Sequence, residues 1–139
     1  MRIMALDYGD KRIGVAISDE TKTFASYSKT LFVSSLTETI DELVKICAEK
    51  DVSDIVVGIP ITMSGENGQM SLKVKEFAYL LNQKTNHKII LWDERLTTSE
   101  AEKVLMNTQI KGKRRRDLVD QVAAKIILQA YLDSINNSA

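Results

Sequence analysis

The stretch "RIMALDYGDKRIGVAISD", residues 2–19, decides the fold of this chain. A first apolar run ends at Asp7, and a second one, residues 12–19, follows the polar turn "YGDK". Two short apolar runs separated by a glycine-containing turn are typical of a β-hairpin. The next segment, 26–33, alternates between polar and apolar residues and is expected to add a third strand. The chain is therefore predicted to begin with three strands in succession, and the first of them ends on an acid.

Helices and strands are expected to alternate after this opening. Apolar residues at helical spacing run through 34–50, and Ser35 followed by Glu38 has the pattern of a capping box. The run "DIVVGIP" at 54–60 is apolar on both alternating faces, as expected for a strand that helices cover on both sides. The segment 61–71 is rich in glycine and polar residues and is predicted to be a mobile loop.

The second half of the chain continues this alternation. A helix is predicted at 72–84, a second buried strand at 88–94, a short helix behind a capping box of Thr97 and Glu100, and a last helix at 117–135. The order of elements predicts an α/β protein with a mixed five-stranded sheet and helices on its faces. The helical residues expected to face the core are Val74, Phe77, Ala78, Leu81, Ala101, Val104, Leu105, Val119, Val122, Ala123, Ile126 and Ala130.

Composition limits the class of protein. A chain of 139 residues with 44% hydrophobic and 27% charged residues is expected to form a single globular domain over 1–139. No apolar run is long enough to cross a bilayer and no signal-type segment opens the chain, so we expect a cytoplasmic protein without a membrane partner. One cysteine, Cys47, and one histidine, His87, exclude a structural zinc site, a disulfide and a histidine-based nucleophile relay. Cys47 is predicted to be a buried, inert thiol and His87 a solvated loop residue.

Acidic residues stand where predicted elements begin or end. Asp7 closes the first strand, Asp93 and Glu94 close the last one, and Asp120 lies near the start of the last helix. Neighbours on a strand point to opposite faces, so only one of Asp93 and Glu94 is expected to face a given site. Asp120 shares a helical face with small apolar residues and is expected at the edge of the packed side. If these element ends converge, three carboxylates meet at one point.

Converging carboxylates indicate a particular chemistry. They repel one another and raise one another's pKa unless a cation neutralises them, and hard oxygen ligands suit Mg²⁺ or Mn²⁺. Two such ions about 4 Å apart can activate a water and stabilise the leaving oxygen of a phosphodiester. Plainer interpretations exist for each acid: Asp7 can shape a turn, Asp93 and Glu94 can be solvated, and Asp120 can complement the helix dipole.

A basic segment precedes the helix that carries Asp120. No acid occurs from 103 to 116, and five positive charges crowd into positions 111–116. Because 19 basic residues balance 19 acidic ones, only such a local cluster can attract a polyanion. A solvated face is the plainer interpretation of this cluster. We predict a loop here that binds a nucleic-acid backbone through Lys111, Lys113, Arg114, Arg115 and Arg116.

Four motifs resemble, in order and spacing, those of the YqgF family, also called RuvX. They read "ALDYGDKRIGVAISD", "VVGIPITMSGENG", "LWDERLTTSEA" and "LVDQVAAKIILQAYL", and together they span nearly the whole chain. The resemblance implies a ribonuclease H-like fold, with a mixed five-stranded sheet flanked by helices. It also implies a divalent-metal-dependent nuclease, a hydrolase of phosphodiester bonds in structured nucleic acid.

The same resemblance implies an acidic catalytic set of Asp7, Asp93, Glu94 and Asp120. Asp7, Glu94 and Asp120 are the expected ligands of Mg²⁺ or Mn²⁺. In the wider fold an acid commonly ends the fourth strand, whereas this chain has "GIP" there, so the acids of the neighbouring strand must substitute. We favour Glu94 over Asp93 as the ligand.

Three basic residues within these motifs, Lys11, Arg12 and Arg95, are expected to contact the substrate or to support the site. The implied activity is processing of the 5′ end of pre-16S rRNA during ribosome biogenesis, with pre-rRNA and ribosomal particles as partners. A Holliday junction resolvase acting on branched DNA in recombination and repair is the alternative. Two copies would then be needed to cut two strands symmetrically, so both a monomer and a homodimer are compatible with the sequence.

Two further interpretations stay open. A nuclease fold without turnover would be a nucleic-acid-binding module. The stretch "LDYGDKRIG" also resembles the phosphate-binding hairpin of actin-like and sugar-kinase ATPases. Those proteins close two related domains around the nucleotide, and this chain has room for one.

Overall fold

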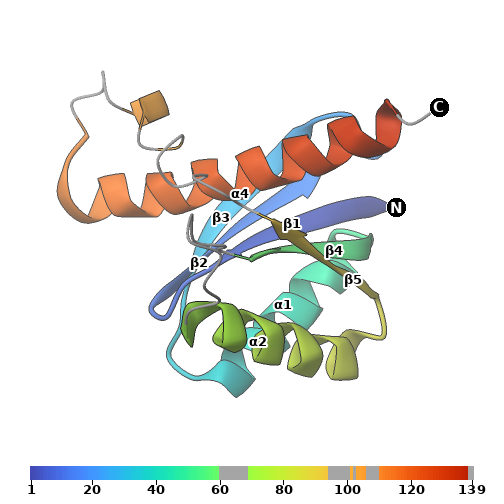
Figure 1. Cartoon of the computed structure of the whole chain (residues 1–139), viewed down its shortest axis with the longest axis horizontal. Helices are drawn as coiled ribbons and strands as arrows, with labels where there is room; N and C mark the ends of the chain where they lie inside the picture. Colours follow the sequence, from blue (N-terminus) through green and yellow to red (C-terminus); the bar gives the residue numbers. More distant parts are fainter. Residues whose placement is uncertain (60–68, 94–100, 102, 106–109, 138–139) are drawn as a thin grey trace.

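A mixed sheet of five strands forms the centre of the computed structural model, which describes residues 1–59, 69–93, 101, 103–105 and 110–137 (Figure 1). The strand order is β3-β2-β1-β4-β5. The first three strands pair antiparallel, and β4 pairs parallel with both β1 and β5. The predicted mixed sheet is confirmed. Its strands are β1 (Arg2–Tyr8), β2 (Arg12–Ser18), β3 (Ala25–Phe32), β4 (Val52–Ile59) and β5 (Lys88–Asp93).

Helices cover both faces of the sheet (Figure 1). Successive residues of a strand pack in different apolar layers. Met4 of β1 and Val57 of β4 pack on the side of α1 and α2, whereas their neighbours Ile3 and Val56 pack on the side of α4. The prediction that β4 is buried on both faces is therefore confirmed. The helices are α1 (Leu36–Glu49), α2 (Gln69–Thr85) and α4 (Gly112–Asn136).

Helix α1 begins as its sequence predicts. The Glu38 backbone N–H donates to the Ser35 hydroxyl oxygen at 3.1 Å, which satisfies one of the unpaired donors of the first turn. The Glu38 carboxylate accepts from the Ser34 hydroxyl at 2.8 Å instead of closing a reciprocal capping box. Cys47 is buried on the inner face, and burial raises the pKa of its thiol to about 11. The predicted burial of Cys47 is confirmed. His87 was expected to be solvated, but it is half-buried just before β5.

The boundary of α2 and the place of β5 differ from expectation. Helix α2 begins at Gln69, so the end of the segment expected as a loop is helical, and residues 60–68 lie outside the described ranges. Strand β5 was expected to be buried, but it is the edge of the sheet, and Leu91 is 44% exposed. Hydropathy reports the apolar content of a strand but not which strands pair with it, so it did not distinguish an edge strand from a central one. The predicted core face of α2 is confirmed: Val74, Phe77, Ala78 and Leu81 are buried.

The short helical segment after β5 is described at 101 and 103–105. Ala101 and Leu105 are buried as predicted. Val104 was expected to face inward, but 63% of it is exposed, which corrects that prediction. The predicted capping box of Thr97 and Glu100 lies outside the described residues.

Helix α4 is longer than predicted, and a different face of it packs against the sheet. It begins at Gly112, so the basic segment expected to be a loop forms its first turns. Lysine and arginine are good helix formers, and an apolar period detects only the turns that pack against a core. Apolar residues almost encircle the middle of α4, so spacing alone did not fix the inner face. Of the predicted stripe only Ala123 is fully buried, Ala130 is exposed, and the buried residues are Ala123, Ala124, Ile127, Leu128, Tyr131 and Leu132.

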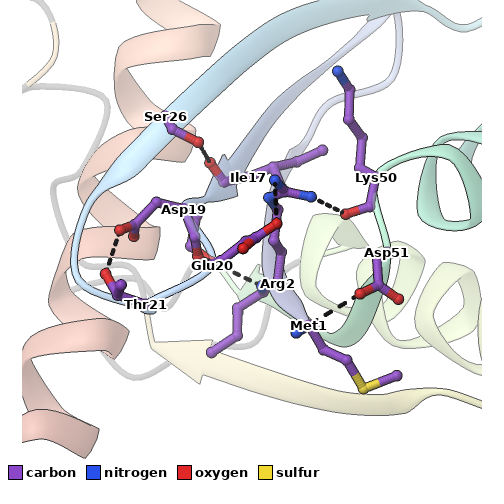
Figure 2. Close-up of polar contacts among 11 residues, drawn as sticks. Met1, Arg2, Ile17, Asp19, Glu20, Thr21, Ser26, Lys50 and Asp51 are labelled. Atoms are coloured by element: carbon purple, nitrogen blue, oxygen red, sulfur yellow. Dashed lines mark hydrogen bonds and ion pairs between the residues drawn. The ribbon is translucent and has the colours of Figure 1, made fainter.

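Polar contacts fix the end of the sheet where β1 starts (Figure 2). The Arg2 guanidinium donates to the Lys50 carbonyl at 2.8 Å and pairs with Glu20 at 3.3 Å. The N-terminal ammonium lies 3.7 Å from the Asp51 carboxylate. This end of β1 is therefore tied both to the end of β2 and to the connection between α1 and β4. None of the described helices is both long and apolar enough to cross a membrane.

Candidate functional site

A row of paired residues at the opposite end of the sheet contains Asp7. Asp7 of β1 pairs with Gly14 of β2, and Gly14 pairs with Thr30 of β3. Directly paired residues on antiparallel strands direct their side chains to the same face. Since Ile3 and Ala5 pack on the side of α4, the alternation along β1 places Asp7 on that side as well. The row therefore lies beneath α4, which crosses β1, β2 and β3 (Figure 1).

Gly14 allows the helix to contact the sheet closely. A Cβ atom at this position would lie 2.0 Å from the backbone oxygen of Asp120, a separation at which the backbone would have to shift. The missing side chain thus brings the backbone of α4 against the strand residue that is paired with Asp7. Glycine inside a strand is a recognised sequence signal of such close approach, and our sequence reasoning did not use it.

Asp120 is held by a residue of the same sheet face. The Arg12 Nε–H donates to Asp120 Oδ2 at 2.6 Å, in an ion pair that joins β2 to α4. The two side chains are only 28% and 18% exposed, so both charges are largely removed from water. A charge in that position needs a partner of opposite sign. Arg12 therefore holds the Asp120 carboxylate, and its expected role at the site is still a prediction.

Asp93 lies on the other face of the sheet. Its Cα is in register with Ile59 of β4. Ile90 and Trp92 pack in the apolar layer beneath α4, whereas Ile89 packs in the layer of α1 and α2. The alternation of β5 thus directs Asp93 away from α4, Asp7 and Asp120. Asp93 is exposed at the end of the strand.

The first turns of α4 present a basic surface. Lys111, Lys113, Arg114 and Arg116 are exposed, as expected of residues that bind an anionic backbone. Arg115 is different, because it is half-buried and its guanidinium donates to the Leu105 carbonyl at 3.0 Å. Lys11, between β1 and β2, is also exposed.

A polar network that sequence reasoning missed fastens α4 to β3 beside Asp120. The Thr30 hydroxyl donates to the Asp117 carbonyl at 2.8 Å and accepts from the Gln121 amide at 3.2 Å. The Ser28 hydroxyl donates to Gln121 Oε1 at 3.1 Å. Ser28 and Thr30 are two apart on one face of β3, a pattern that we interpreted only as strand alternation. Together with Gly14, these contacts set the position of Asp120 over the sheet.

The structure thus brings together two of the four predicted acids. Asp7 and Asp120 lie at one end and on one face of the sheet, and Asp93 does not join them. Glu94 and Arg95 lie outside the described residues. Within the described part of the chain, no three His, Cys, Asp or Glu side chains are grouped closely enough to hold a metal ion. The metal centre with Glu94 as a ligand is therefore still a prediction.

Two solved structures share this arrangement of strands and helices. RuvC of T. thermophilus in complex with a Holliday junction substrate superposes with a TM-score of 0.60 at 9% sequence identity, covering 100% of this chain and 98% of that chain. The fowlpox virus Holliday junction resolvase superposes with a TM-score of 0.59 at 15% identity, covering 96% of this chain and 99% of that chain. The ribonuclease H-like fold is confirmed.

Sequence comparison extends the likeness to a family. The family model of RuvX, described as "Holliday junction resolvase", matches residues 1–134. A protein of Clostridium tetani (strain Massachusetts / E88) named "Putative pre-16S rRNA nuclease" is 45% identical over 137 residues, which are 99% of this chain and 99% of that protein. The family match includes the two strands and the helix that carry Asp7, Arg12 and Asp120. The chain belongs to the RuvX family.

Proposed function

We propose that this protein is a divalent-metal-dependent nuclease whose reaction is the processing of the 5′ end of pre-16S rRNA during ribosome biogenesis. The observation that carries the proposal is that Asp7 of β1 and Asp120 of α4 lie at the same end and on the same face of the sheet. Membership of the RuvX family and the name of the Clostridium tetani relative support the choice of nuclease and substrate. We place the reaction in the cytoplasm.

The donor set fits Mg²⁺ or Mn²⁺. Carboxylate oxygens are the ligands that these hard cations prefer, and Asp120 already takes a cationic partner, the guanidinium of Arg12. Asp7, Asp120 and Glu94 would hold the metal, and we choose Glu94 because Asp93 is directed to the other face of the sheet. A metal bound there would activate a water and stabilise the leaving oxygen of a phosphodiester.

The other residues have supporting parts in this proposal. Arg12 positions the Asp120 carboxylate, and the polar network around Thr30 keeps α4 in place. The exposed cations of α4 and Lys11 bind the phosphate backbone without reading its bases. Arg115 holds the Leu105 carbonyl, so we assign it to structure rather than to substrate binding.

The test is a cleavage assay with Mg²⁺ or Mn²⁺ on a small-subunit rRNA precursor. Asp7→Asn, Glu94→Gln and Asp120→Asn should each abolish cleavage, because each removes a negatively charged ligand. Asp93→Asn is the matched control and should remain active. Unimpaired cleavage by all three variants would refute the metal centre. An inactive Asp93→Asn together with an active Glu94→Gln would mean that Asp93, and not Glu94, is the ligand.

A Holliday junction resolvase is the second candidate, favoured by the description of the family model. That activity needs two copies of the chain, since two strands must be cut symmetrically. Cleavage of a four-way DNA junction, measured beside the rRNA precursor together with the mass in solution, distinguishes the two. A dimer that cuts only the junction would replace the rRNA proposal, and binding without cleavage of either substrate would identify a binding module.

A further inference from the structure

An aromatic side chain beside the candidate site is exposed to solvent. Phe32 is the last residue of β3 and is 54% exposed. It pairs with Arg12, the residue whose guanidinium holds Asp120. Since paired residues share a face, Phe32 lies on the same side of the sheet as α4. One strand pairing and one ion pair therefore connect this ring with the acid that we propose as a metal ligand.

The surroundings of Phe32 are positively charged. The Lys113 ammonium lies 4.8 Å from the centre of the ring, in a cation–π contact. Arg116 follows one helical turn after Lys113, and both side chains are exposed. An exposed aromatic ring among cations is the combination with which proteins bind single-stranded nucleic acid, because the ring stacks on a base and the cations pair with phosphates.

We propose that Phe32 is a stacking platform for an unpaired base of the substrate, and that Lys113 and Arg116 pair with the adjoining phosphates. A base that stacks on the ring takes the place of the Lys113 ammonium. The displaced ammonium is on a flexible stem, and an exposed cation–π contact is weak, so this exchange costs little. Bases within a duplex already have both faces covered by their neighbours. The substrate would accordingly carry an unpaired nucleotide next to the bond that is cut.

This inference rests on the proposed nuclease function, but its test uses binding rather than cleavage. A fluorescein-labelled single-stranded RNA, the same RNA in a blunt duplex and a single-stranded DNA of the same sequence are titrated with the full chain in EDTA, so that no strand is cut. Phe32→Ala should weaken binding of the single-stranded RNA about ten-fold, as expected for the loss of one stacked base. Duplex affinity should change little, and Phe32→Trp should restore single-strand binding.

Phe24→Ala is the matched control. Phe24 is 64% exposed, but it lies at the other end of the sheet beside Asp19, and its removal should leave all affinities unchanged. Equal loss on single-stranded DNA and RNA would identify the base and not the sugar as the recognised group. Parental affinity in Phe32→Ala, or an equal loss on duplex, would overturn the inference while leaving the nuclease proposal intact. If the parent protein binds none of the three nucleic acids, the stacking inference is wrong, and the cleavage assay with Mg²⁺ or Mn²⁺ decides the nuclease proposal separately.

Discussion

The two ends of the sheet carry aspartates in contrasting situations. Asp19, just after β2, accepts hydrogen bonds from the backbone N–H groups of Thr23 at 2.9 Å and Phe24 at 3.0 Å and from the Thr21 hydroxyl. These bonds lower the pKa of Asp19 to about 2. Asp120, at the other end, pairs with Arg12, which is 108 residues away in the chain.

The difference indicates which acid is structural and which is suited to a site. All the donors of Asp19 lie within five residues of it, so its charge is satisfied by its own turn and serves to shape that turn. The charge of Asp120 is matched by a side chain that only the tertiary fold brings near. A metal ion can replace Arg12 as the partner of the Asp120 carboxylate. It cannot displace the backbone N–H groups that bind Asp19 without disrupting the turn.

The largest effect is expected at the contact between β2 and α4. Gly14→Val would place a Cβ atom 2.0 Å from the Asp120 carbonyl, and further methyl groups would extend into the helix. We expect a loss of about 3 kcal/mol or more in the free energy of unfolding, together with loss of cleavage, because α4 must move away from the sheet. Urea unfolding followed by Trp92 fluorescence measures the first quantity, since Trp92 packs edge-on against Tyr131 of α4.

Gly112→Ala is the control for this change. No atom lies within 4 Å of a Cβ atom there, but the residue has a φ of 68°. The backbone strain of a left-handed alanine costs about 1 kcal/mol, without disturbing the contact between helix and sheet. A Gly14→Val protein no less stable than Gly112→Ala would show that the close approach is not required.

The ion pair at the site offers the next largest effect. Without metal, Asp120→Asn should lower the free energy of unfolding by about 1–2 kcal/mol, because the partly buried Arg12 loses its charged partner. Arg12→Met introduced together with Asp120→Asn should recover most of this loss, since no uncompensated charge then remains. Strictly additive effects in this double-mutant cycle would mean that the two side chains do not interact in solution.

The basic residues in the first turns of α4 are expected to contribute more to nucleic-acid binding than other basic residues on the surface. Lys113→Ser, Arg114→Ser and Arg116→Ser in one protein should flatten the log–log dependence of duplex affinity on salt by about 0.9 for each phosphate that is no longer bound. Arg115 is left in place because it holds the Leu105 carbonyl. Affinity measured by fluorescence anisotropy over a range of salt concentrations gives the slope.

A protein with the same number of charges removed from the other face controls for net charge. Lys45, Lys75 and Lys84 are exposed on α1 and α2, and their replacement by serine should leave the salt slope near its parental value. Equal slopes for the two triple variants would mean that the basic turns have no special part in binding.

At the end of the sheet that carries Asp19, Asp19→Asn should change the free energy of unfolding in a pH-dependent way and leave cleavage unchanged. The pKa of Asp19 is lowered from 3.8 to about 2, so the folded state favours the charged form. The contribution of this carboxylate is complete above its ordinary pKa and is lost as the pH falls toward 2. The parent should therefore exceed the variant in stability at neutral pH, by a margin that shrinks below about pH 4.

Titration of the Asp19 carboxyl carbon by NMR, with urea unfolding of both proteins, provides the check. A midpoint near the ordinary pKa would mean that the turn does not persist in solution. Reduced cleavage by a stable Asp19→Asn protein would remove the distinction between the two ends.

The smallest effect is expected from the exposed pair of Arg2 and Glu20. The Glu20 side chain is 77% exposed and its contact with Arg2 is 3.3 Å long, so solvent screens the attraction (Figure 2). Glu20→Gln should change the free energy of unfolding by less than about 0.5 kcal/mol. Arg2→Ala should cost more than Glu20→Gln, because Arg2 also donates to the Lys50 carbonyl. Equal effects in urea unfolding would show that the carbonyl contact adds nothing.

Local patterns in the sequence determined the elements of this protein. Short apolar runs predicted four of the strands, and the alternation of polar and apolar residues predicted β3. Helical spacing predicted α1 and the inner face of α2, and Ser35 marked the start of α1. These features depend on neighbours within a few residues, which is the range that a pattern can report. The candidate acids were also identifiable, because they stand where predicted elements begin or end.

Only the tertiary structure decided which of these residues meet. The pairing of β5 with β4 alone makes it an edge strand, and its register directs Asp93 away from the face on which Asp7 lies. The inner face of α4 was fixed by the Gly14 contact and the Thr30 network rather than by apolar spacing, because several stripes of that helix are apolar enough to pack. Residues distant in sequence come together through strand order and helix docking, and neither leaves a periodic signal in the chain.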